Sequence, residues 1–255
     1  MIRKEKFITF GVIFAILLIW YGVTERKLVS SAMVPSPKSV VSVFFSILHD
    51  NYKGISLWRH LSVSLGRLIG AFFLAVFFAV PLGLASGYNT KIRAAFEPIV
   101  EFYRPLPPLA YYTLIVLWMG IENSSKIMLL FLAAFAPIYV ACVSAMRMVK
   151  IDYVNSALTL GASPLQVFFY VSLPACLPGI FTGVRTAIGV AYTTLVAAEM
   201  VAAVSGIGWL VLDASRYLRS DIIFMGILIM GLTGITLDQM IRLLESKIVF
   251  WKGKE

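Results

Sequence analysis

Long apolar runs, repeated along the chain, constrain its fold more than any other feature. They lie at 7–23, 62–88, 105–120, 126–146, 177–203 and 222–241. A helix needs about 20 apolar residues to cross the roughly 30 Å hydrocarbon core of a bilayer, because each residue adds about 1.5 Å. In lipid, only helices and closed barrels satisfy their own backbone hydrogen bonds. The pattern predicts an all-α integral membrane protein, with about six transmembrane helices in a single domain, 1–255.

The first apolar run has two interpretations. It extends from Phe7 to Val23 after the basic start MIRKEKF, and a secretory signal peptide has the same general pattern. Ser30 and Ala32 resemble the small residues of a cleavage site, but Arg26 and Lys27 lie between them and the apolar run. We therefore expect a retained first span.

Composition supports burial in lipid and excludes nucleic-acid binding. Hydrophobic residues make up 60% of the chain and charged residues only 14%, whereas soluble domains have roughly 45–50% and about 25%. The net charge of +9 comes from basic residues whose densest groups lie near the ends of apolar runs. Such flanking charge is typical of membrane proteins, whose Lys and Arg residues face headgroups and cytoplasm.

The distribution of Lys and Arg also predicts an orientation. Six spans place both termini on one side of the membrane. If that side is the cytoplasm, the inner segments hold twelve basic residues and the outer segments eight, which agrees with the positive-inside tendency. We expect a multi-pass protein of the cell (inner) membrane with cytoplasmic N- and C-termini.

The chain lacks the residue patterns of an enzyme. It contains neither a Gly-x-Ser-x-Gly nucleophile motif nor a Gly-x-x-x-x-Gly-Lys phosphate loop, so we expect no catalytic residues and no ATP hydrolysis by this chain. His49 and His60 have no metal-ligand spacing, and we expect both to be solvated or interfacial. Cys142 and Cys176 are expected to be small buried hydrophobes. No cofactor or metal is predicted for this chain. An integral-membrane enzyme remains as a rival, which activity of the purified chain would support.

Ionisable residues inside apolar runs are costly in lipid and are therefore candidates for function. Arg185 and Glu199 lie fourteen residues apart in the fifth run. On a helix this spacing places them within about 40° of one face and roughly 21 Å apart, too far for an ion pair. They either line a path or an interface, or extend to opposite headgroup layers. Arg67 and Asp238 are weaker candidates.

The segment 152–174 interrupts the series of spans. Val154 to Leu160 has helical spacing, and Gly161 is placed to end that helix in a left-handed conformation. Ser163 is placed to cap a second helix that has Pro164 in its first turn and continues to Pro174. Such an apolar helix pair on the inner side of the membrane predicts a partner protein.

This segment resembles the cytoplasmic EAA loop of importer permeases of the ATP-binding cassette (ABC) class. The family pattern is Glu-Ala-Ala, three residues, Gly, and after about nine more Ile-x-Leu-Pro. Here the chain reads NSALTLGA from Asn155 to Ala162 and VSLP from Val171 to Pro174. Asn155 and Ser156 stand in place of the Glu and the first Ala, so the loop lacks a charge. Asn keeps a side-chain acceptor of similar reach, and we expect coupling to be preserved.

The resemblance covers nearly the whole chain. The stretches Glu101–Ile121, Ser124–Ile138 and Thr194–Val211 and the terminal FWKGKE are similar to the branch that imports nitrate, aliphatic sulfonates and taurine, and are most similar to taurine permeases. The resemblance implies a type I ABC importer permease fold and import of taurine or a related aliphatic sulfonate. Import of nitrate or of a thiamine-precursor-like solute remains open, as does an ATP-independent channel or scaffold.

The resemblance also implies partners and site residues. The partners are a second copy of the chain, two ABC ATPase subunits that bind ATP and Mg²⁺, and an external substrate-binding protein. The residues expected to couple the chain to the ATPase are Asn155, Ser156, Ala157, Gly161, Ala162, Ser163, Leu173 and Pro174. Those expected on the translocation path are Arg104, Arg185 and Glu199.

Overall fold

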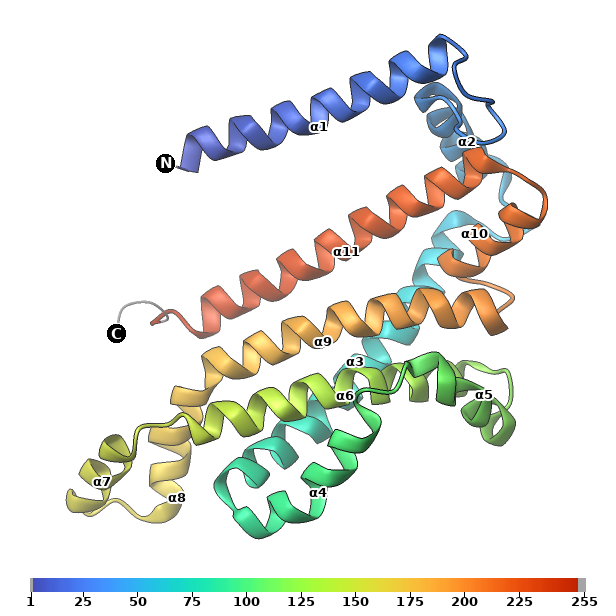
Figure 1. Cartoon of the computed structure of the whole chain (residues 1–255). Helices are drawn as coiled ribbons and strands as arrows, with labels where there is room; N and C mark the ends of the chain where they lie inside the picture. Colours follow the sequence, from blue (N-terminus) through green and yellow to red (C-terminus); the bar gives the residue numbers. More distant parts are fainter. Residues whose placement is uncertain (1, 252–255) are drawn as a thin grey trace. The chain divides into compact units, whose positions relative to one another are not determined.

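The computed structural model describes residues 2–251, and their side chains from residue 7 onward. Basic residues used above for orientation, among them Arg3, Lys4, Lys252 and Lys254, lie outside the described side chains. The described chain is almost entirely helical (Figure 1). Its helices are α1 Ile2–Glu25, α2 Pro37–Asp50, α3 Leu57–Tyr88, α4 Thr90–Tyr103, α5 Pro108–Met119, α6 Asn123–Arg147, α7 Ile151–Thr159, α8 Pro164–Val167, the π-helical segment η1 Phe168–Ser172, α9 Leu173–Ala202, α10 Ile207–Arg216 and α11 Ser220–Ile248.

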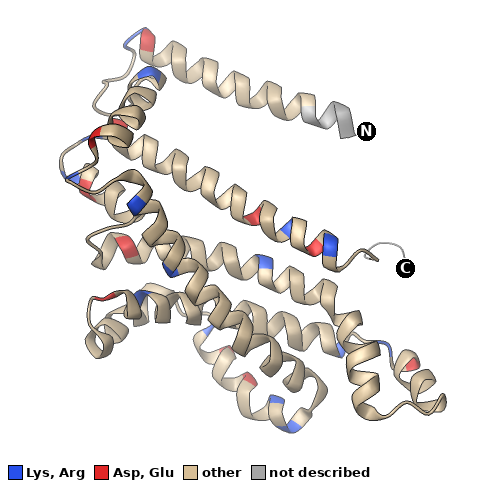
Figure 2. Ribbon diagram, turned by 180° about the vertical axis from the view of Figure 1, so that it is seen from behind, with Lys and Arg blue, Asp and Glu red and all other residues tan. Residues whose placement is uncertain are grey.

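Within the described residues, five helical stretches are long and apolar enough to cross a membrane. They are Phe7–Glu25, Leu57–Tyr88, Asn123–Arg147, Pro164–Ala202 and Ser220–Ile248. Figure 2 shows that charged residues are sparse along these helices and more frequent near their ends and in the connections. This architecture confirms the predicted all-α integral membrane fold.

The chain divides into two compact units, one formed by Met1–Val63 and Val204–Leu232, the other by Ser64–Ala203 and Thr233–Glu255. The first unit has its own apolar core, in which residues of α2, α10 and the start of α11 meet. Ser36 begins α2 by accepting a hydrogen bond from the backbone N–H of Ser39, and Pro37 occupies the first turn. This is the arrangement that a helix start favours.

A tight turn in the first unit is tied to α10 by a carboxylate. Tyr52 and Ile55 exchange backbone hydrogen bonds across Lys53 and Gly54, which both have positive φ. The Tyr52 hydroxyl donates to Asp213 at 2.8 Å, and the Lys53 Nζ lies 2.7 Å from the same carboxylate. Burial raises the pKa of Asp213, but the hydrogen bonds from Lys53 and Tyr52 outweigh it and hold that pKa below its usual value. Burial and the bond to Asp213 raise the pKa of Tyr52 to about 12.

His60 is placed differently from the sequence expectation. We predicted a solvated or interfacial side chain, but His60 is fully buried in the first unit. Its ring stacks on Trp209, and its Nδ1 lies 3.1 Å from both the backbone nitrogen and the carbonyl oxygen of Gly206. The burial arises because Gly206 and Trp209, which are distant in sequence, pack against His60, and the sequence around His60 does not reveal this contact. His49 is exposed, as expected.

In the second unit, the close approaches at two glycines show how α3 packs on α6. A Cβ added at Gly83 would lie 2.6 Å from the Cβ of Cys142, and one added at Gly87 would lie 2.5 Å from that of Met146. Small residues at such spacing allow helices in lipid to approach closely. Because both residue numbers rise together, α3 and α6 run parallel.

Two further glycines show the relative direction of α9 and α6, which pack closely at these positions. Gly179 faces Ala145, and Gly183 faces Ala141. Here one number rises while the other falls, so α9 runs antiparallel to α6. The core of this unit consists of the facing sides of α3, α6 and α9, and Cys142 and Cys176 are buried in it.

The parallel run of α3 and α6 requires a return crossing between them, and two short helices make it. The chain leaves α3 at Tyr88, at the end of the unit where α6 finishes, and must reach Asn123, where α6 begins. Helices α4 and α5 cover this distance (Figure 1). The predicted span at 105–120 corresponds to α5 alone, whose 12 residues extend only about 18 Å. Pro105 and Pro107 separate the two helices because proline lacks the N–H that helix continuation needs.

Candidate coupling knuckle and translocation groove

The first candidate site is the coupling knuckle, which we define as residues 151–172 between α6 and α9 (Figure 1). Helix α7 buries none of its residues. It ends at Thr159, and Gly161, two residues further on, has a left-handed φ of +85°, as predicted. The Gly161 N–H donates to the Leu158 carbonyl at 2.9 Å and the Ala162 N–H to that of Ala157 at 3.1 Å. This pair of bonds is the Schellman motif, which satisfies carbonyls at a helix end.

The second helix of the knuckle starts with a capping box. The Gln166 N–H donates to the Ser163 Oγ at 3.4 Å, and the Ser163 N–H donates to the Gln166 side chain at 2.7 Å. Pro164 occupies the first turn, as predicted. The two helices of the knuckle therefore join through a short connection that is closed by its own hydrogen bonds.

The helix that begins at Pro164 does not end at Pro174, contrary to our prediction. It continues through η1 into α9, so that one helical stretch extends from Pro164 to Ala202. Pro174 follows directly after the π-helical turn of η1, whose wider turn accommodates the proline ring within the continuing helical stretch. Leu173 and Pro174 are half-buried at this junction.

The knuckle presents apolar side chains outward while two residues anchor it. Val167 and Ser172 are buried, and the Phe168 ring packs edge-on against Tyr88 at 6.0 Å. The exposed apolar residues are Ile151, Tyr153, Leu158, Leu160, Leu165, Phe169 and Tyr170, and Leu160 reaches 88% exposure. Such a concentration of exposed apolar surface marks a site of interaction.

The residues that replace the family's Glu and first Ala lie on the outer surface of α7. Asn155 and Ser156 are exposed, and the Asn155 carbonyl accepts a hydrogen bond from the Thr159 hydroxyl at 2.9 Å. Ala157 and Ala162 are half-buried, and Ser163 is exposed. Asp152, in the first turn of α7, supplies a carboxylate one turn before Asn155.

The second candidate site is the translocation groove, a cavity of about 460 Å³ in the second unit. Its walls come from α5, α6, α9 and the α4–α5 connection. Tyr103, Arg104 and Tyr111 form its polar edge. Its other lining residues are Leu106, Pro108, Leu132, Ala133, Ala136, Pro137, Val140, Ala141, Thr182, Gly183, Thr186 and Val190. Arg104, predicted on the translocation path, is thus placed at a cavity whose size suits a small molecule.

Arg185 lines a neighbouring cavity of about 310 Å³. This cavity shares Thr182 and Thr186 with the groove and adds Asp238 and Glu245 of α11. The Arg185 guanidinium forms an ion pair with Asp238, which also accepts from Arg242 at 2.9 Å. Arg104 and Arg185 therefore lie at two cavities joined by one stripe of α9.

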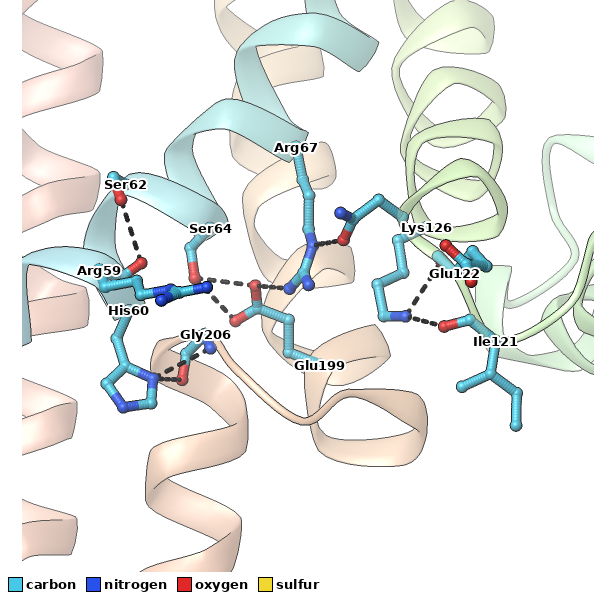
Figure 3. A network of polar contacts seen from close by, with 11 residues as sticks. Arg59, His60, Ser62, Ser64, Arg67, Ile121, Glu122, Lys126, Glu199 and Gly206 are labelled. Carbon is cyan, nitrogen blue, oxygen red and sulfur yellow. Dashed lines mark hydrogen bonds and ion pairs between the residues drawn. The ribbon is translucent and has the colours of Figure 1, made fainter. Parts of the chain in front are cut away.

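Glu199 is placed apart from both cavities, in a buried polar network (Figure 3). Its Oε1 lies 2.7 Å from the Arg67 Nη1, and the Ser64 hydroxyl lies 2.8 and 2.9 Å from its two oxygens. The Arg67 Nε donates to the Asn123 side chain at 2.8 Å. Nearby, the Lys126 Nζ donates to the carbonyls of Ile121 and Glu122. The network joins α3, α6 and α9 at the end of the unit opposite the knuckle.

Sequence reasoning missed several residues of these sites. Arg67 was only a weak candidate, because its partner Glu199 is distant in sequence and becomes a neighbour only when α3 packs on α9. Tyr103, Thr182 and Thr186 carry no charge or motif that distinguishes them from ordinary helix residues. The prolines after Tyr103 were the available signal, since a helix break in a membrane places side chains against a cavity. Within the described residues, no cluster of His, Cys, Asp and Glu has the geometry of a metal site.

Comparison with known proteins is consistent with this architecture. Residues 79–250 match the family described as "Binding-protein-dependent transport system inner membrane component". The taurine transport system permease protein TauC of Escherichia coli (strain K12) is 36% identical over 254 residues, which is 99% of this chain and 92% of that protein. The putative aliphatic sulfonates transport permease protein SsuC of Bacillus subtilis (strain 168) is 31% identical over 93% of this chain and 85% of that protein. The bicarbonate transport system permease protein CmpB of a Synechocystis strain is 27% identical over 94% of this chain and 87% of that protein.

A solved structure shows the same fold. A chain in inward-facing conformations of the MetNI methionine ABC transporter aligns with a TM-score of 0.61 over 76% of this chain and 94% of that chain, at 18% identity. This likeness confirms the predicted type I ABC importer permease fold. The chain belongs to the family of binding-protein-dependent transport system inner membrane components.

Proposed function

We propose that this chain is the transmembrane permease subunit of an ATP-driven importer for taurine or a related aliphatic sulfonate. Full-length similarity to a taurine permease and to sulfonate permeases supports this substrate class. The observation that carries the proposal is the knuckle, because an exposed apolar surface is joined by one unbroken helical stretch to the wall of a small-molecule groove.

The knuckle supports coupling to an ATPase. Two ATPase subunits would bind ATP and Mg²⁺ and dock on the exposed side chains of α7, α8 and η1. The chain has no phosphate loop of its own, so the energy must come from such partners. Asp152 offers the only nearby carboxylate on the described part of α7, and it takes over the charge that Asn155 lacks.

A lever motion follows from the helix geometry. Pro164 and Thr182 lie eighteen residues apart in one continuous helical stretch, which bends between α8 and α9 (Figure 1). A displacement of α7 and α8 would be passed along this continuous stretch to the Thr182–Thr186 wall of the groove. Alternation between ATP-bound and ATP-free partner subunits would open the groove to one side of the membrane and then to the other.

The remaining parts of the importer are inferred from the family. We propose a homodimer whose two copies enclose the path, an external binding protein that delivers the substrate, and cytoplasmic N- and C-termini. With this orientation the knuckle lies on the cytoplasmic side, where ATP is available. Cysteine labelling from either side of intact cells tests the orientation.

Uptake of labelled taurine into proteoliposomes that contain the complete complex tests the substrate class. Alkanesulfonates should compete, whereas bicarbonate, nitrate and thiamine precursors should not. Uptake of nitrate or bicarbonate instead of any sulfonate would contradict the proposal.

A charged substitution on the knuckle tests whether the ATPase docks there. Leu160→Asp should abolish co-purification of the ATPase, because Leu160 is 88% exposed and loses no internal contact. Leu218→Asp, at a position that is 81% exposed in the other unit, is the matched control and should leave co-purification intact. Equal binding of the ATPase to both variants would exclude the knuckle as its docking site.

A further inference from the structure

The turn after α10 holds an exposed leucine in a left-handed conformation. Leu218 has a φ of +55°, and it is 81% exposed. The Leu218 N–H donates to the Ser215 carbonyl at 3.1 Å, and the Arg219 N–H donates to the Ala214 carbonyl at 3.0 Å. These bonds form a Schellman motif in which Leu218 occupies the left-handed position that usually holds glycine. Tyr217, the preceding residue, is also exposed, and we call Tyr217 and Leu218 together the α10 knob.

The same motif in the knuckle contains the expected glycine. Gly161 occupies the left-handed position there, with a φ of +85°. A bulky side chain at such a position is strained. Because Leu218 is so exposed, contacts within the chain do little to offset this strain. Strained backbone of this kind clusters at active sites, ligand clamps and switches, so the position of Leu218 points to a role outside the chain.

A polar recess of about 760 Å³ adjoins the α10 knob. Leu218 and Lys27 both line it and both have left-handed φ, and Glu25 adds a charge opposite to that of Lys27. The Ser220 hydroxyl joins two walls of the recess by donating to the Ser31 carbonyl at 3.1 Å. The hydroxyl groups that line it belong to Thr24, Ser30, Ser31, Ser36, Ser39 and Ser220. Such a polar surface is costly in hydrocarbon, so the knob projects beside water and not into the lipid core.

The charge presented around the α10 knob is positive. Lys53 lies over the aromatic ring of the knob, 4.2 Å from its centroid. The Lys53 side chain is 43% exposed and its partner Asp213 only 9%, while Arg219 is 51% exposed and its partner Asp221 20%. In each pair the cation is the member that faces the surroundings, and Arg216 adds a third exposed cation. A partner that fits this surface carries carboxylates around an apolar hollow.

The α10 knob lies on the opposite side of the membrane from the knuckle. The helical stretch Pro164–Ala202 begins in the knuckle, crosses the membrane and leads into α10. In the proposed orientation the knuckle is cytoplasmic, so the knob faces the outside. An apolar projection with polar and charged surroundings has the anatomy of a protein–protein interface, whose core is apolar and whose rim is polar.

We infer that the α10 knob and the recess beside it form the docking surface for the external binding protein. That protein supplies an apolar hollow for the knob and carboxylates for Lys53, Arg216 and Arg219. The strained turn holds the knob ready for this contact. The inference rests on the proposed function, which includes such a partner but assigns it no surface on this chain.

Two substitutions of Leu218 separate docking from folding. The purified complex with its ATPase is placed in nanodiscs of zwitterionic lipid and titrated with the binding protein that supports uptake. Leu218→Gly keeps the Schellman motif and removes the strain, so its melting temperature should not fall. Leu218→Gly and Leu218→Asp should each weaken docking by at least about ten-fold, as expected for a residue at the centre of an interface. Phe45→Asp, at an exposed apolar position of α2 that does not line the recess, is the control and should dock as the wild type does.

A third substitution tests the sign of the partner's charge. Arg216→Gln should weaken docking by about two- to five-fold and reduce its dependence on salt, because exposed charges at an interface rim act mainly on association. Docking that is insensitive to both salt and Arg216→Gln would contradict an acidic partner surface.

The outcomes separate this inference from the proposed function. If both Leu218 variants dock normally while the wild type imports sulfonates, the inference fails and the proposed function stands. If the variants dock normally but retain less lipid, the knob is a membrane anchor; if they lose the dimer on size exclusion, it is a contact between copies. Either result refutes the inference. Docking that depends on Leu218 in a complex that imports no sulfonate would instead contradict the proposed substrate and leave the docking surface in place.

Discussion

Removal of Glu199 provides a sharp test of the buried polar network. The carboxylate is 1% exposed and its partner Arg67 6%, so neither group is solvated by water in the folded chain. In Glu199→Ala, Arg67 keeps its bond to Asn123 but has lost the carboxylate that neutralises it. The Ser64 hydroxyl loses the same acceptor.

The expected cost follows from the burial of the remaining charge. Breaking a buried ion pair by removing one partner costs about 3–5 kcal/mol, mostly because the other charge stays desolvated. For a chain of this size, each kcal/mol corresponds to roughly 2–4 °C in melting temperature. We therefore expect the melting temperature of Glu199→Ala to fall by about 6–20 °C.

A second variant distinguishes two causes of destabilisation, the unpaired charge left on Arg67 and the loss of side-chain packing. Replacing both partners, in Arg67→Met with Glu199→Leu, removes the charges together and should restore most of the lost melting temperature. Both variants are measured by intrinsic fluorescence melting of the purified complex in the same detergent. If the double variant melts as low as Glu199→Ala, or if Glu199→Ala melts within about 2 °C of the wild type, the stranded-charge explanation is wrong.

Three further predictions concern other parts of the chain. Gly83→Ala should destabilise the fold by about 1–3 kcal/mol in a denaturation assay, because its new Cβ meets α6 backbone and side chain, whereas Gly70→Ala, with open space around it, should be neutral. Gly161→Val should abolish transport while ATP hydrolysis by the partner continues, because a β-branched residue resists the +85° φ; normal coupled transport would exclude the lever. The depressed pKa of Asp213 means that its bonds, including that from Lys53, stabilise the fold above the ordinary value of 3.8 and are lost as pH falls through the lowered pKa. Asp213→Asn should therefore flatten the loss of melting temperature below about pH 4, and an unchanged acid limb would contradict this assignment.

Local patterns predicted much of the helical architecture because their physical causes are local. The apolar runs set the long helices, and Gly161, Ser163 and Pro164 have the roles that cap chemistry assigns them. The prediction that Pro174 ends a helix failed, because the chain forms a π-helical segment, η1, just before the proline, and the helical stretch continues past it. The sequence around Pro174 does not reveal that the preceding turn is π-helical.

The sequence identified individual charged residues as candidates for the polar sites, but it did not predict which of them pair. Charge inside apolar runs identified Arg185 and Glu199, and the same criterion included Arg67 and Asp238 with less weight. The pairing of Glu199 with Arg67 arises from packing between helices that are far apart in sequence. Tyr103 has an ordinary residue type, and nothing in the local sequence indicates that it lines a cavity.

The unbroken helix from the knuckle to the groove also fixes an angular relationship. Each residue added to or removed from a helix rotates everything beyond it by about 100°. A one-residue deletion in α9, between Pro174 and Thr182, would rotate Thr182 and Thr186 away from the groove, even if every other side chain were retained. The number of residues in this stretch therefore fixes the direction in which the groove wall faces relative to the knuckle. Substitutions can vary the surface that a partner contacts, but an insertion or deletion would change that direction.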